Sequence, residues 1–171
     1  MKQDYPRVTL RAIEPEDLDL LYRIENDVKL WNVGTSNVPY SRYTLHEYIA
    51  NTSGDIYVDR QVRMMIENEH HQVVGIVDIV NFDPSNRRAE LGLVIEEPFR
   101  QMGYGLSTIR QIAAYALNVL HLHQLFAFID ARNEPCLQLF RELGCIETSK
   151  LKDWLFDGTE YHEAVVMQMV L

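Results

Sequence analysis

The chain has 171 residues, of which 47% are hydrophobic, and this is enough apolar material for the core of one domain but not of two. We therefore expect a single domain over residues 1–171. The formal charge is −9, and no cationic run is longer than Arg87-Arg88, which argues against nucleic acid as a partner. No stretch approaches the roughly 20 apolar residues that span a bilayer, and residues 1–6 lack the apolar core of a signal peptide. We expect a cytoplasmic protein with no membrane partner.

Cysteine and histidine positions predict neither a disulfide nor a metal site. Cys136 and Cys145 lie nine positions apart, without a Cys-x-x-Cys pattern or a histidine at ligand spacing. The pair His70-His71 falls in a polar turn, and His121 and His123 alternate along a strand-like run. We therefore expect two buried thiols and no metal.

The chain opens with a strand that leads into a helix. Residues 7–13 alternate polar and apolar side chains, which is the period of a half-buried strand. Pro15 stands where a first helical turn needs no backbone N–H, and apolar residues follow it at helical spacing. Thr44 and Glu47 match a capping box, so we expect a second short helix that ends near Asn51.

From residue 56 the pattern changes to long strands. Residues 62–66 and 73–80 flank a polar turn and predict a hairpin, and residues 89–95 predict the next strand. Three antiparallel strands would therefore follow one another along the chain.

The second half alternates helices and strands. An apolar helix face is expected over residues 106–120, followed by an apolar strand at 124–130. Asn133 and Gly144 are typical of the start and end of another helix, and two strands around residues 157–158 close the chain. The fold class is therefore α/β, or α+β in stricter usage, with helices on the faces of a mixed sheet.

A glycine-containing turn joins strand 89–95 to the helix that follows. Gly103 and Gly105 would let backbone N–H groups point at an anion, and the helix N-terminus would add partial positive charge. We expect the missing Cβ of Gly105 to let the backbone approach a pyrophosphate closely. A plain tight connection is the structural alternative. No Lys-Ser/Thr follows the second glycine, which disfavours nucleotide hydrolysis.

The string Arg100-Gln101-Met102-Gly103-Tyr104-Gly105 resembles the Q/R-x-x-G-x-G/A signature of the GCN5-related N-acetyltransferase (GNAT) superfamily. Asn133-Glu134-Pro135-Cys136, with Leu143-Gly144 downstream, is similar to the superfamily's N-x-x-A/S and L-G-F segment. Residues 87–90 and 154–161 resemble the branch that contains ribosomal-protein N-terminal acetyltransferases and spermidine N-acetyltransferases.

This resemblance implies a mostly antiparallel sheet of six to seven strands flanked by about four helices. It also implies an enzyme that moves an acetyl group from acetyl-CoA to a primary amine by direct transfer in a ternary complex, without a metal. The acceptor would be a protein N-terminus, a polyamine or another small amine. An assembly of identical subunits is compatible with this assignment.

The resemblance also assigns the acyl-CoA contacts. The end of strand 89–95 would separate from its neighbour and pair with the pantetheine arm, and Pro98 would end this pairing. Asn133 would face the arm near the thioester, or would act only as a helix cap, with equal weight. The implied contacts are Leu93, Val94, Ile95, Arg100, Gln101, Met102, Gly103, Tyr104, Gly105, Leu106, Ser107, Asn133 and Phe140.

Glu90 is the candidate catalytic base. Leu91, Leu93 and Ile95 alternate with it, so Glu90 projects from the opposite face of the strand. A neutral amine must form before transfer, and a carboxylate can take its proton directly or through water. The structural alternative is an ion pair with Arg87, Arg88 or another nearby cation. A backbone N–H near Val94 would meet the oxyanion.

One residue departs from the superfamily pattern. Phe140 stands where many relatives carry a tyrosine seven residues after the asparagine, and phenylalanine cannot donate a proton. Tyr104 and Tyr161 are conceivable substitutes. The missing acid also leaves open an alternative function, a CoA-binding sensor or regulatory module without turnover.

Residues 30–48, a region that contains several aromatic side chains, are expected to form the wall of the acceptor site. Trp31, Tyr40 and Glu47 are the candidate substrate-binding residues, although Trp31 is equally suited to the core. The region lacks the run of acidic residues that would indicate a polyamine site.

Overall fold

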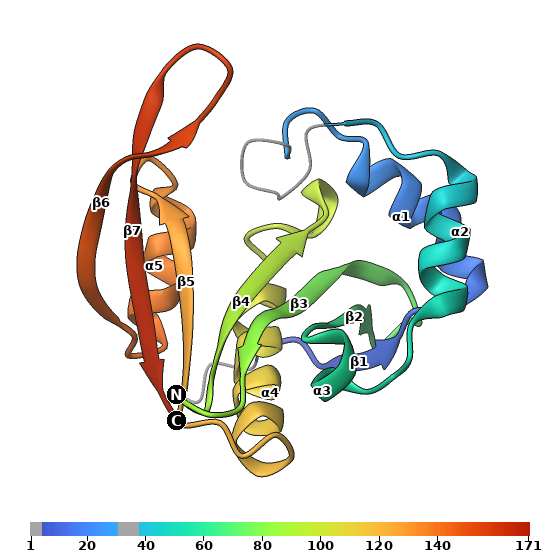
Figure 1. Ribbon diagram of the computed structural model, residues 1–171, viewed down its shortest axis with the longest axis horizontal. Coiled ribbons are helices and arrows are strands. Elements are labelled where there is room, and N and C mark those ends of the chain that lie inside the picture. The colour runs from blue at the N-terminus through green and yellow to red at the C-terminus, as the bar shows by residue number, and fades with distance from the viewer. Residues whose placement is uncertain (1–4, 31–37) are drawn as a thin grey trace.

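The computed structural model describes residues 5–30 and 38–171. Its strands are β1 (Val8–Ala12), β2 (Val62–Asn68), β3 (Val73–Asp83), β4 (Arg88–Ile95), β5 (Gln124–Asp130), β6 (Ile146–Phe156) and β7 (Tyr161–Val170). They form one seven-stranded sheet in the order β1-β2-β3-β4-β5-β7-β6 (Figure 1). β4 and β5 pair in parallel, and the other neighbours pair antiparallel. The predicted α/β class and mixed sheet are confirmed.

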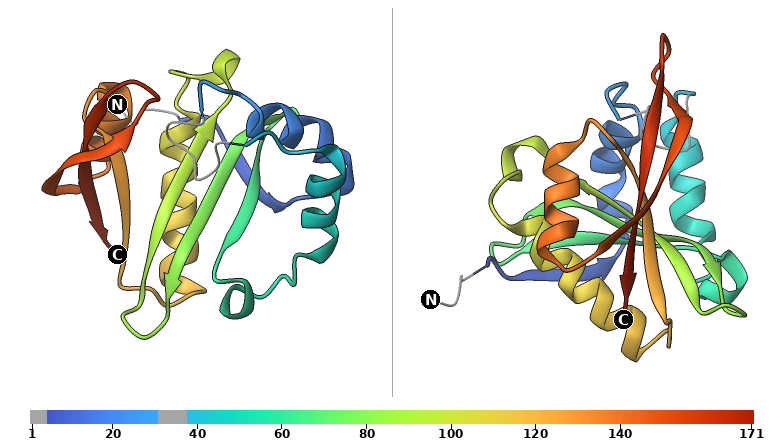
Figure 2. Two further views of the ribbon diagram at one scale, coloured as in Figure 1. Left: turned by 45° about the horizontal axis from the view of Figure 1, so that its top comes forward. Right: turned by 90° about the vertical axis from the view of Figure 1, so that its left-hand side faces the viewer.

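Helices cover both faces of this sheet. They are α1 (Leu18–Glu25), α2 (Arg42–Asn51), α3 (Ile56–Asp59), α4 (Tyr104–Asn118) and α5 (Glu134–Glu142), with 3-10 turns η1 (Pro15–Asp17) and η2 (Glu97–Phe99). Figure 2 shows α4 and α5 on one face and α1 and α2 on the other. The side chains of successive β4 residues point to opposite faces of the sheet. Leu91 belongs to the core under α4 and α5, whereas Val94 packs against the buried cluster under α1 and α2.

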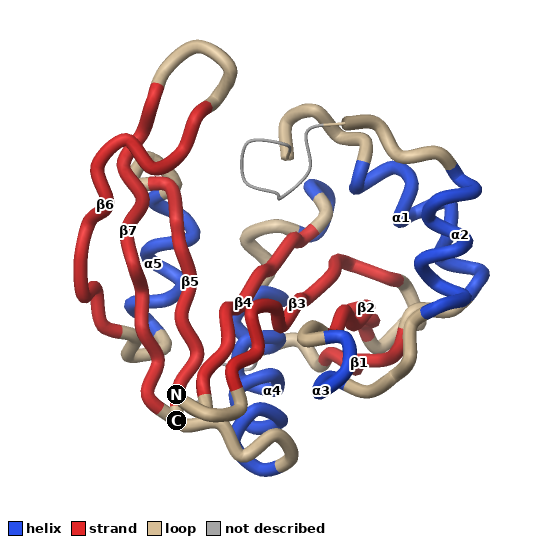
Figure 3. The backbone as a smooth tube through the Cα atoms, in the orientation of Figure 1, coloured by secondary structure: helices blue, strands red, loops and turns tan. Residues whose placement is uncertain are grey.

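The structure corrects two of the expected local elements. α2 begins earlier than the sequence pattern indicated, because Ser41 is its cap and the Ser41 Oγ accepts the Thr44 N–H at 3.0 Å. Thr44 therefore lies inside the helix. Residues 56–59 form α3 instead of extended chain, because the Asp55 carboxylate accepts the Tyr57 N–H at 2.8 Å and caps a helical turn. Figure 3 shows this short helix before β2, together with the long β6–β7 hairpin.

A buried ion pair fixes the start of α1 against β1. Asp17 is only 6% exposed, and its two carboxylate oxygens accept Arg11 N–H groups at 2.8 and 3.0 Å. The Glu14 N–H donates a further hydrogen bond at 2.8 Å. Burial by itself raises the pKa of Asp17, but these hydrogen bonds outweigh it and hold the pKa below its ordinary value. Arg11 also donates to Glu67 of β2 at 2.8 Å, so one guanidinium joins the first helix to two strands.

We predict that Asp17→Asn lowers the free energy of unfolding by about 1–3 kcal/mol at neutral pH, because charged hydrogen bonds are lost from a buried position. Urea unfolding measures this change. A group with a lowered folded pKa stabilises above its unfolded pKa of about 3.9 and loses that contribution as the pH falls. The difference between wild type and variant should therefore shrink below about pH 4. Asp19→Asn, at an 84% exposed carboxylate, is the matched control and should change little; equal effects of both variants would contradict this account.

Candidate functional site

The parallel contact between β4 and β5 is short. Only Arg88–Glu90 pair with Gln124–Phe126, although both strands continue. β5 instead keeps pairing with β7 as far as Asp130. A central strand is normally covered on both sides, yet residues 92–95 of β4 are all partly exposed. The predicted separation is confirmed, and the two groups of strands diverge upward in Figure 1. We call the space between residues 91–95 and residues 127–130 the strand gap.

Within the described residues, the turn before α4 leaves backbone donors without partners. Gln101 and Gly103 have positive φ of 60° and 88°, which turns the chain sharply into the helix. No described side chain caps α4 or α1, whereas side chains cap α2, α3 and α5. The Ser107 N–H bonds to the Gly103 carbonyl at 3.1 Å and begins the helical pattern. The preceding N–H groups of residues 104–106 are thus available to an anion, at the positive end of a helix of 15 residues.

The role expected for Gly105 needs a correction. A Cβ at this residue would lie 3.1 Å from Leu139 Cδ2 and 3.5 Å from Leu93 Cδ2. It would therefore point into the core and not toward an anion at the helix end. The missing side chain of Gly105 lets α4 pack closely on β4 and α5, and its contribution to anion binding is limited to its N–H. Of the two glycines in this turn, only Gly103 has a positive φ, the backbone conformation that favours glycine.

Side chains around this turn add one cation to the backbone donors. The Arg100 Nε donates to the Ile95 carbonyl at 2.9 Å, while its terminal nitrogens make no hydrogen bond within the described residues. Met102 is 57% exposed. Leu106 is buried and Ser107 is half-buried, so the first turn of α4 rests on the core. The exposed surface of the turn therefore combines a guanidinium with N–H groups that have no partner in the described part of the chain.

Asn133 lies at the carboxyl end of β5, at the edge of the sheet where β4 also ends. Its Oδ1 accepts the Cys136 N–H at 3.2 Å, which confirms the predicted helix cap. The Nδ2 group makes no hydrogen bond to any described residue and remains able to donate to a ligand. Asn133 lines a pocket of about 420 Å³ together with Asp130, Arg132 and Pro135. Capping and ligand binding are thus compatible in one side chain.

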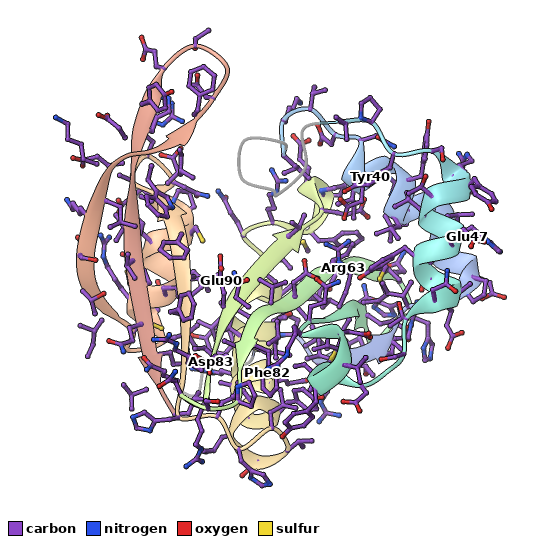
Figure 4. The ribbon with its side chains drawn as sticks, viewed as in Figure 1. Tyr40, Glu47, Arg63, Phe82, Asp83 and Glu90 are labelled. Atoms are coloured by element: carbon purple, nitrogen blue, oxygen red, sulfur yellow. The ribbon has the colours of Figure 1, made fainter. Side chains whose placement is uncertain are left out.

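Glu90 lies beside the strand gap on the face covered by α1 and α2 (Figure 4). Its Oε2 accepts the Asn81 Nδ2 at 2.6 Å. A bulge in β3 brings Asn81 there with a φ of 50°. The ion pairs proposed as an alternative do not form, since Arg88 pairs with Asp83 at 3.4 Å and Arg87 donates to the His121 carbonyl at 2.6 Å. Glu90 therefore has no cationic partner among the described residues.

A second polar group on this face was not found from the sequence. Arg63 of β2 donates to both oxygens of Asp78 on β3, at 2.7 and 2.9 Å, and also pairs with Glu25 of α1. Burial disfavours the charge of Arg63, but the Asp78 carboxylate outweighs it and raises the pKa of the guanidinium. Asp78 lies 15 positions from Arg63 and is brought to it by strand register, whereas Glu25 lies 38 positions away and is brought to it by the packing of α1 on the sheet.

Aromatic side chains from the other group of strands face Glu90. Phe126 is paired with Glu90 across the parallel contact, so the two share a face. The Phe126 and Phe128 rings meet edge to face with centroids 5.7 Å apart, and Trp154 of β6 stacks on Phe128 at 5.8 Å. Trp154 is 56% exposed. This aromatic row also went unnoticed in the sequence, because β6 pairs beyond β7.

No aromatic hydroxyl stands at the expected acid position. Phe140 is 4% exposed and belongs to the core between α5 and the sheet. Tyr104 packs edge to face on Phe99 at 6.0 Å. Tyr161 is 63% exposed at the start of β7, with its ring 4.9 Å from that of Phe156. Tyr104 lies on α4 and Tyr161 lies on β7, so neither hydroxyl comes from α5, where the expected acid would stand.

The candidate acceptor residues lie in different places. Tyr40 is held by Asn26, whose side chain bonds to both its N–H and its carbonyl at 2.8 and 3.1 Å. Tyr40 packs against the same buried cluster as Val94. Glu47 is 48% exposed on the outer side of α2 (Figure 4), since Leu45 occupies the buried side. The structure therefore does not bring Glu47 together with Glu90. Trp31 lies outside the described residues.

Both cysteines are free thiols, and burial raises the pKa of Cys136 and of Cys145 to about 11. Within the described residues, no three His, Cys, Asp or Glu side chains are grouped to hold a metal ion. None of the helices in that part of the chain is long and apolar enough to cross a membrane. A larger pocket of about 650 Å³ lies along β1 and β2, and its lining includes Arg63 as well as residues of α2 and α4.

Known proteins share this fold. The chain aligns with the spermidine N-acetyltransferase of Vibrio cholerae, solved in complex with CoA and spermine, with a TM-score of 0.84 and 22% identity over 95% of each chain. A dodecameric structure of that enzyme gives a TM-score of 0.78 at 23% identity, over 95% of this chain and 93% of the other. At this identity the agreement shows a common fold.

Comparison of the amino-acid sequence with known proteins gives relatives of the same kind. The spermidine N(1)-acetyltransferase of Escherichia coli K12 is 24% identical over 160 residues, which is 94% of this chain and 84% of that protein. YdaF of Bacillus subtilis, provisionally named a ribosomal N-acetyltransferase, is 25% identical over 170 residues, or 95% of this chain and 91% of that protein. The model of the acetyltransferase (GNAT) domain family matches residues 7–146. The chain therefore belongs to the GNAT family and is an N-acetyltransferase.

Proposed function

We propose that this enzyme moves the acetyl group of acetyl-CoA directly to a primary amine, which is a protein N-terminus or a small amine such as a polyamine. The observation that carries the proposal is the strand gap, which opens next to the uncapped N-terminus of α4. Unpaired backbone of β4 suits an amide-rich arm, and the helix end suits phosphates. Ligands of such sheets bind outside the carboxyl ends of parallel strands, where β4 and β5 separate.

The residues of the turn fit the coenzyme. The N–H groups of residues 104–106 and the Arg100 guanidinium would hold the pyrophosphate, and Asn133 Nδ2 would donate to the pantetheine arm. Leu93 to Ile95 would pair with the arm through their backbone. Bound in this way, the coenzyme supplies an acetyl group activated as a thioester.

Glu90 supplies the base. An amine arrives as an ammonium ion and must lose a proton before its nitrogen can bond to the acetyl carbon. Glu90 takes this proton directly or through water, because it is held by Asn81 and has no neutralising cation among the described residues. The nitrogen then bonds to the acetyl carbon, and the carbon–sulfur bond breaks with its electron pair going to sulfur. The nitrogen loses its second proton to the departing thiolate, so the products are the amide and the free thiol. Direct transfer is favoured over an acetyl-cysteine because both thiols are protonated at neutral pH.

Release of free thiol from acetyl-CoA, measured over a panel of peptides with free N-termini, polyamines and other small amines, tests the proposal. Thiol release that depends on one class of amine supports it. Tight binding of acetyl-CoA without thiol release from any amine would instead support the CoA-binding sensor.

Placing a negative charge at the turn should weaken acetyl-CoA binding. We predict that Met102→Glu lowers the affinity about 3- to 10-fold at low ionic strength, because the new carboxylate faces the phosphates at an exposed position. Calorimetry at 0.05 and 0.5 M salt measures the effect, which should shrink at the higher salt. Met102→Gln has a similar length without charge and is the control. Equal affinities of the two variants at low salt would place the phosphates elsewhere.

Removing the base should slow the chemical step. Glu90→Gln preserves size and the hydrogen bond from Asn81, and we predict a loss of about 10²–10⁴-fold in kcat at neutral pH with little change in acetyl-CoA affinity. Glu69→Gln, in the exposed β2–β3 turn, is the control and should retain wild-type kcat. An unchanged rate in Glu90→Gln, with chemistry shown to be limiting, would leave Glu90 a structural role only.

Restoring the phenol should help the thiolate to leave. We predict that Phe140→Tyr raises kcat about tenfold, equivalent to roughly 1.4 kcal/mol, with little change in acetyl-CoA affinity. The ring is buried, so thermal unfolding must accompany the kinetics. A folded variant with unchanged or lower kcat would contradict the prediction. If Tyr104→Phe or Tyr161→Phe also abolished turnover, the acid would be that tyrosine.

A further inference from the structure

Gly92 occupies an unusual place in the sheet. It lies in the fourth of seven strands, opposite Asp78 and just beyond the last pair between β4 and β5. Glycine weakens a strand interior because it loses more backbone freedom and packs no side chain. Its presence in a central strand therefore requires a reason.

The fold itself does not supply that reason. Gly92 has no positive φ. A Cβ at this position would contact only Asp78, at 3.5 Å from its Cβ and 3.8 Å from its Oδ2, which are ordinary van der Waals distances. Gly75 behaves differently, because a Cβ there would overlap the carbonyl oxygen of Val94. The protein needs glycine at position 75 but has room for alanine at position 92. The space above Gly92 is therefore available to a ligand.

Carboxylates lie on two sides of this space. Glu90 precedes Gly92 by two residues and projects from the same face, and Asp78 faces it across the strand pair. Arg63 holds both oxygens of Asp78, so the carboxylate keeps a fixed orientation. Gly92 is partly exposed, which shows that this space is open to solvent. Phe126, opposite Glu90, borders it from β5.

We infer that the amino group of the acceptor enters over Gly92, in the space that a side chain would fill, and that Asp78 binds its ammonium form before Glu90 takes the proton. This inference rests on the proposed function and specifies how that site selects a primary amine. Asp78 and Glu90 bind the cation from two sides, and Arg63 positions Asp78. A bulkier residue at position 92 would exclude the amine without touching the turn at residues 100–106.

Gly92→Ala tests the inference. Steady-state kinetics with acetyl-CoA and either spermidine or a peptide with a free N-terminus should show at least a tenfold rise in KM for the amine that is turned over. The Kd for acetyl-CoA should stay within about twofold, and the melting temperature within a few degrees. Gly92→Val should show a larger rise in the same KM. Ser149→Thr adds a methyl group to an exposed position of the edge strand β6 and should behave as wild type.

Asp78→Asn tests the second carboxylate. It preserves size and an oxygen for Arg63, and should raise KM for the amine about tenfold while the acetyl-CoA Kd stays unchanged. Arg63→Lys, which keeps the charge but loses the two-pronged hydrogen bond, should raise the same KM and shift its pH profile. An unchanged KM in folded Asp78→Asn would remove Asp78 from the site.

Two results would overturn the role of Gly92. One is an unchanged amine KM in a folded Gly92→Ala variant. The other is a loss of acetyl-CoA affinity equal to the loss for the amine, which would assign the space to the coenzyme. Failure of the proposed function is separable, because it appears as no thiol release by the wild type. Calorimetric titration of the same amines into CoA-saturated protein then decides for Gly92: weaker binding by Gly92→Ala supports the inference, and equal binding or none to either protein contradicts it.

Discussion

The site depends on one constraint, the early end of the parallel pairing between β4 and β5. Three residue pairs join the two halves of the sheet, and beyond them β5 stays with β7 while β4 stays with β3. The divergence exposes the backbone and side chains of residues 92–95, which a fully paired central strand would bury. The sheet tolerates this opening because α4 and α5 cover its other face with one continuous core. The core beneath α4 and α5 therefore holds the two halves of the sheet together where strand pairing is missing.

One strand and the turn after it gather the parts of the proposed reaction. The backbone of β4 faces the gap, alternate side chains from Glu90 to Val94 face α1 and α2, and the strand leads through η2 into the uncapped helix α4. The glycines have distinct physical roles. Gly103 permits a positive φ and Gly105 permits close helix packing, while Gly92 leaves space that the protein itself does not use. Glycines that look alike in the sequence thus meet different structural requirements.

Much of the fold could be predicted because its signals are local. Alternation predicted the antiparallel β2–β3–β4 order, and capping chemistry at Asn133 predicted α5. The glycine turn could be placed between strand and helix for the same reason. Two local signals were ambiguous: Thr44 and Glu47 fit a cap that Ser41 supplies, and a missing Cβ at Gly105 could face either the ligand or the core. The Arg63–Asp78 pair, the Asn81–Glu90 hydrogen bond and the Phe128–Trp154 stack depend on strand register, a bulge and sheet order. These three contacts therefore cannot be predicted from local patterns in a single sequence.

Under the proposed function, the distribution of charge explains how an acidic protein would bind both an anionic coenzyme and a cationic acceptor. The donors at residues 104–106 and Arg100 lie at the carboxyl end of β4, whereas Glu90 lies near its beginning. Ile95 lies five residues beyond Glu90 along the extended strand, a distance of roughly 17 Å. This exceeds the Debye length of about 8 Å at physiological ionic strength. A carboxylate at position 90 can therefore attract an ammonium ion without repelling phosphates at the turn. In the proposed complex, the same spacing would require an extended coenzyme arm along residues 93–95, so the length of the unpaired strand would determine how far the acetyl group reaches toward the amine.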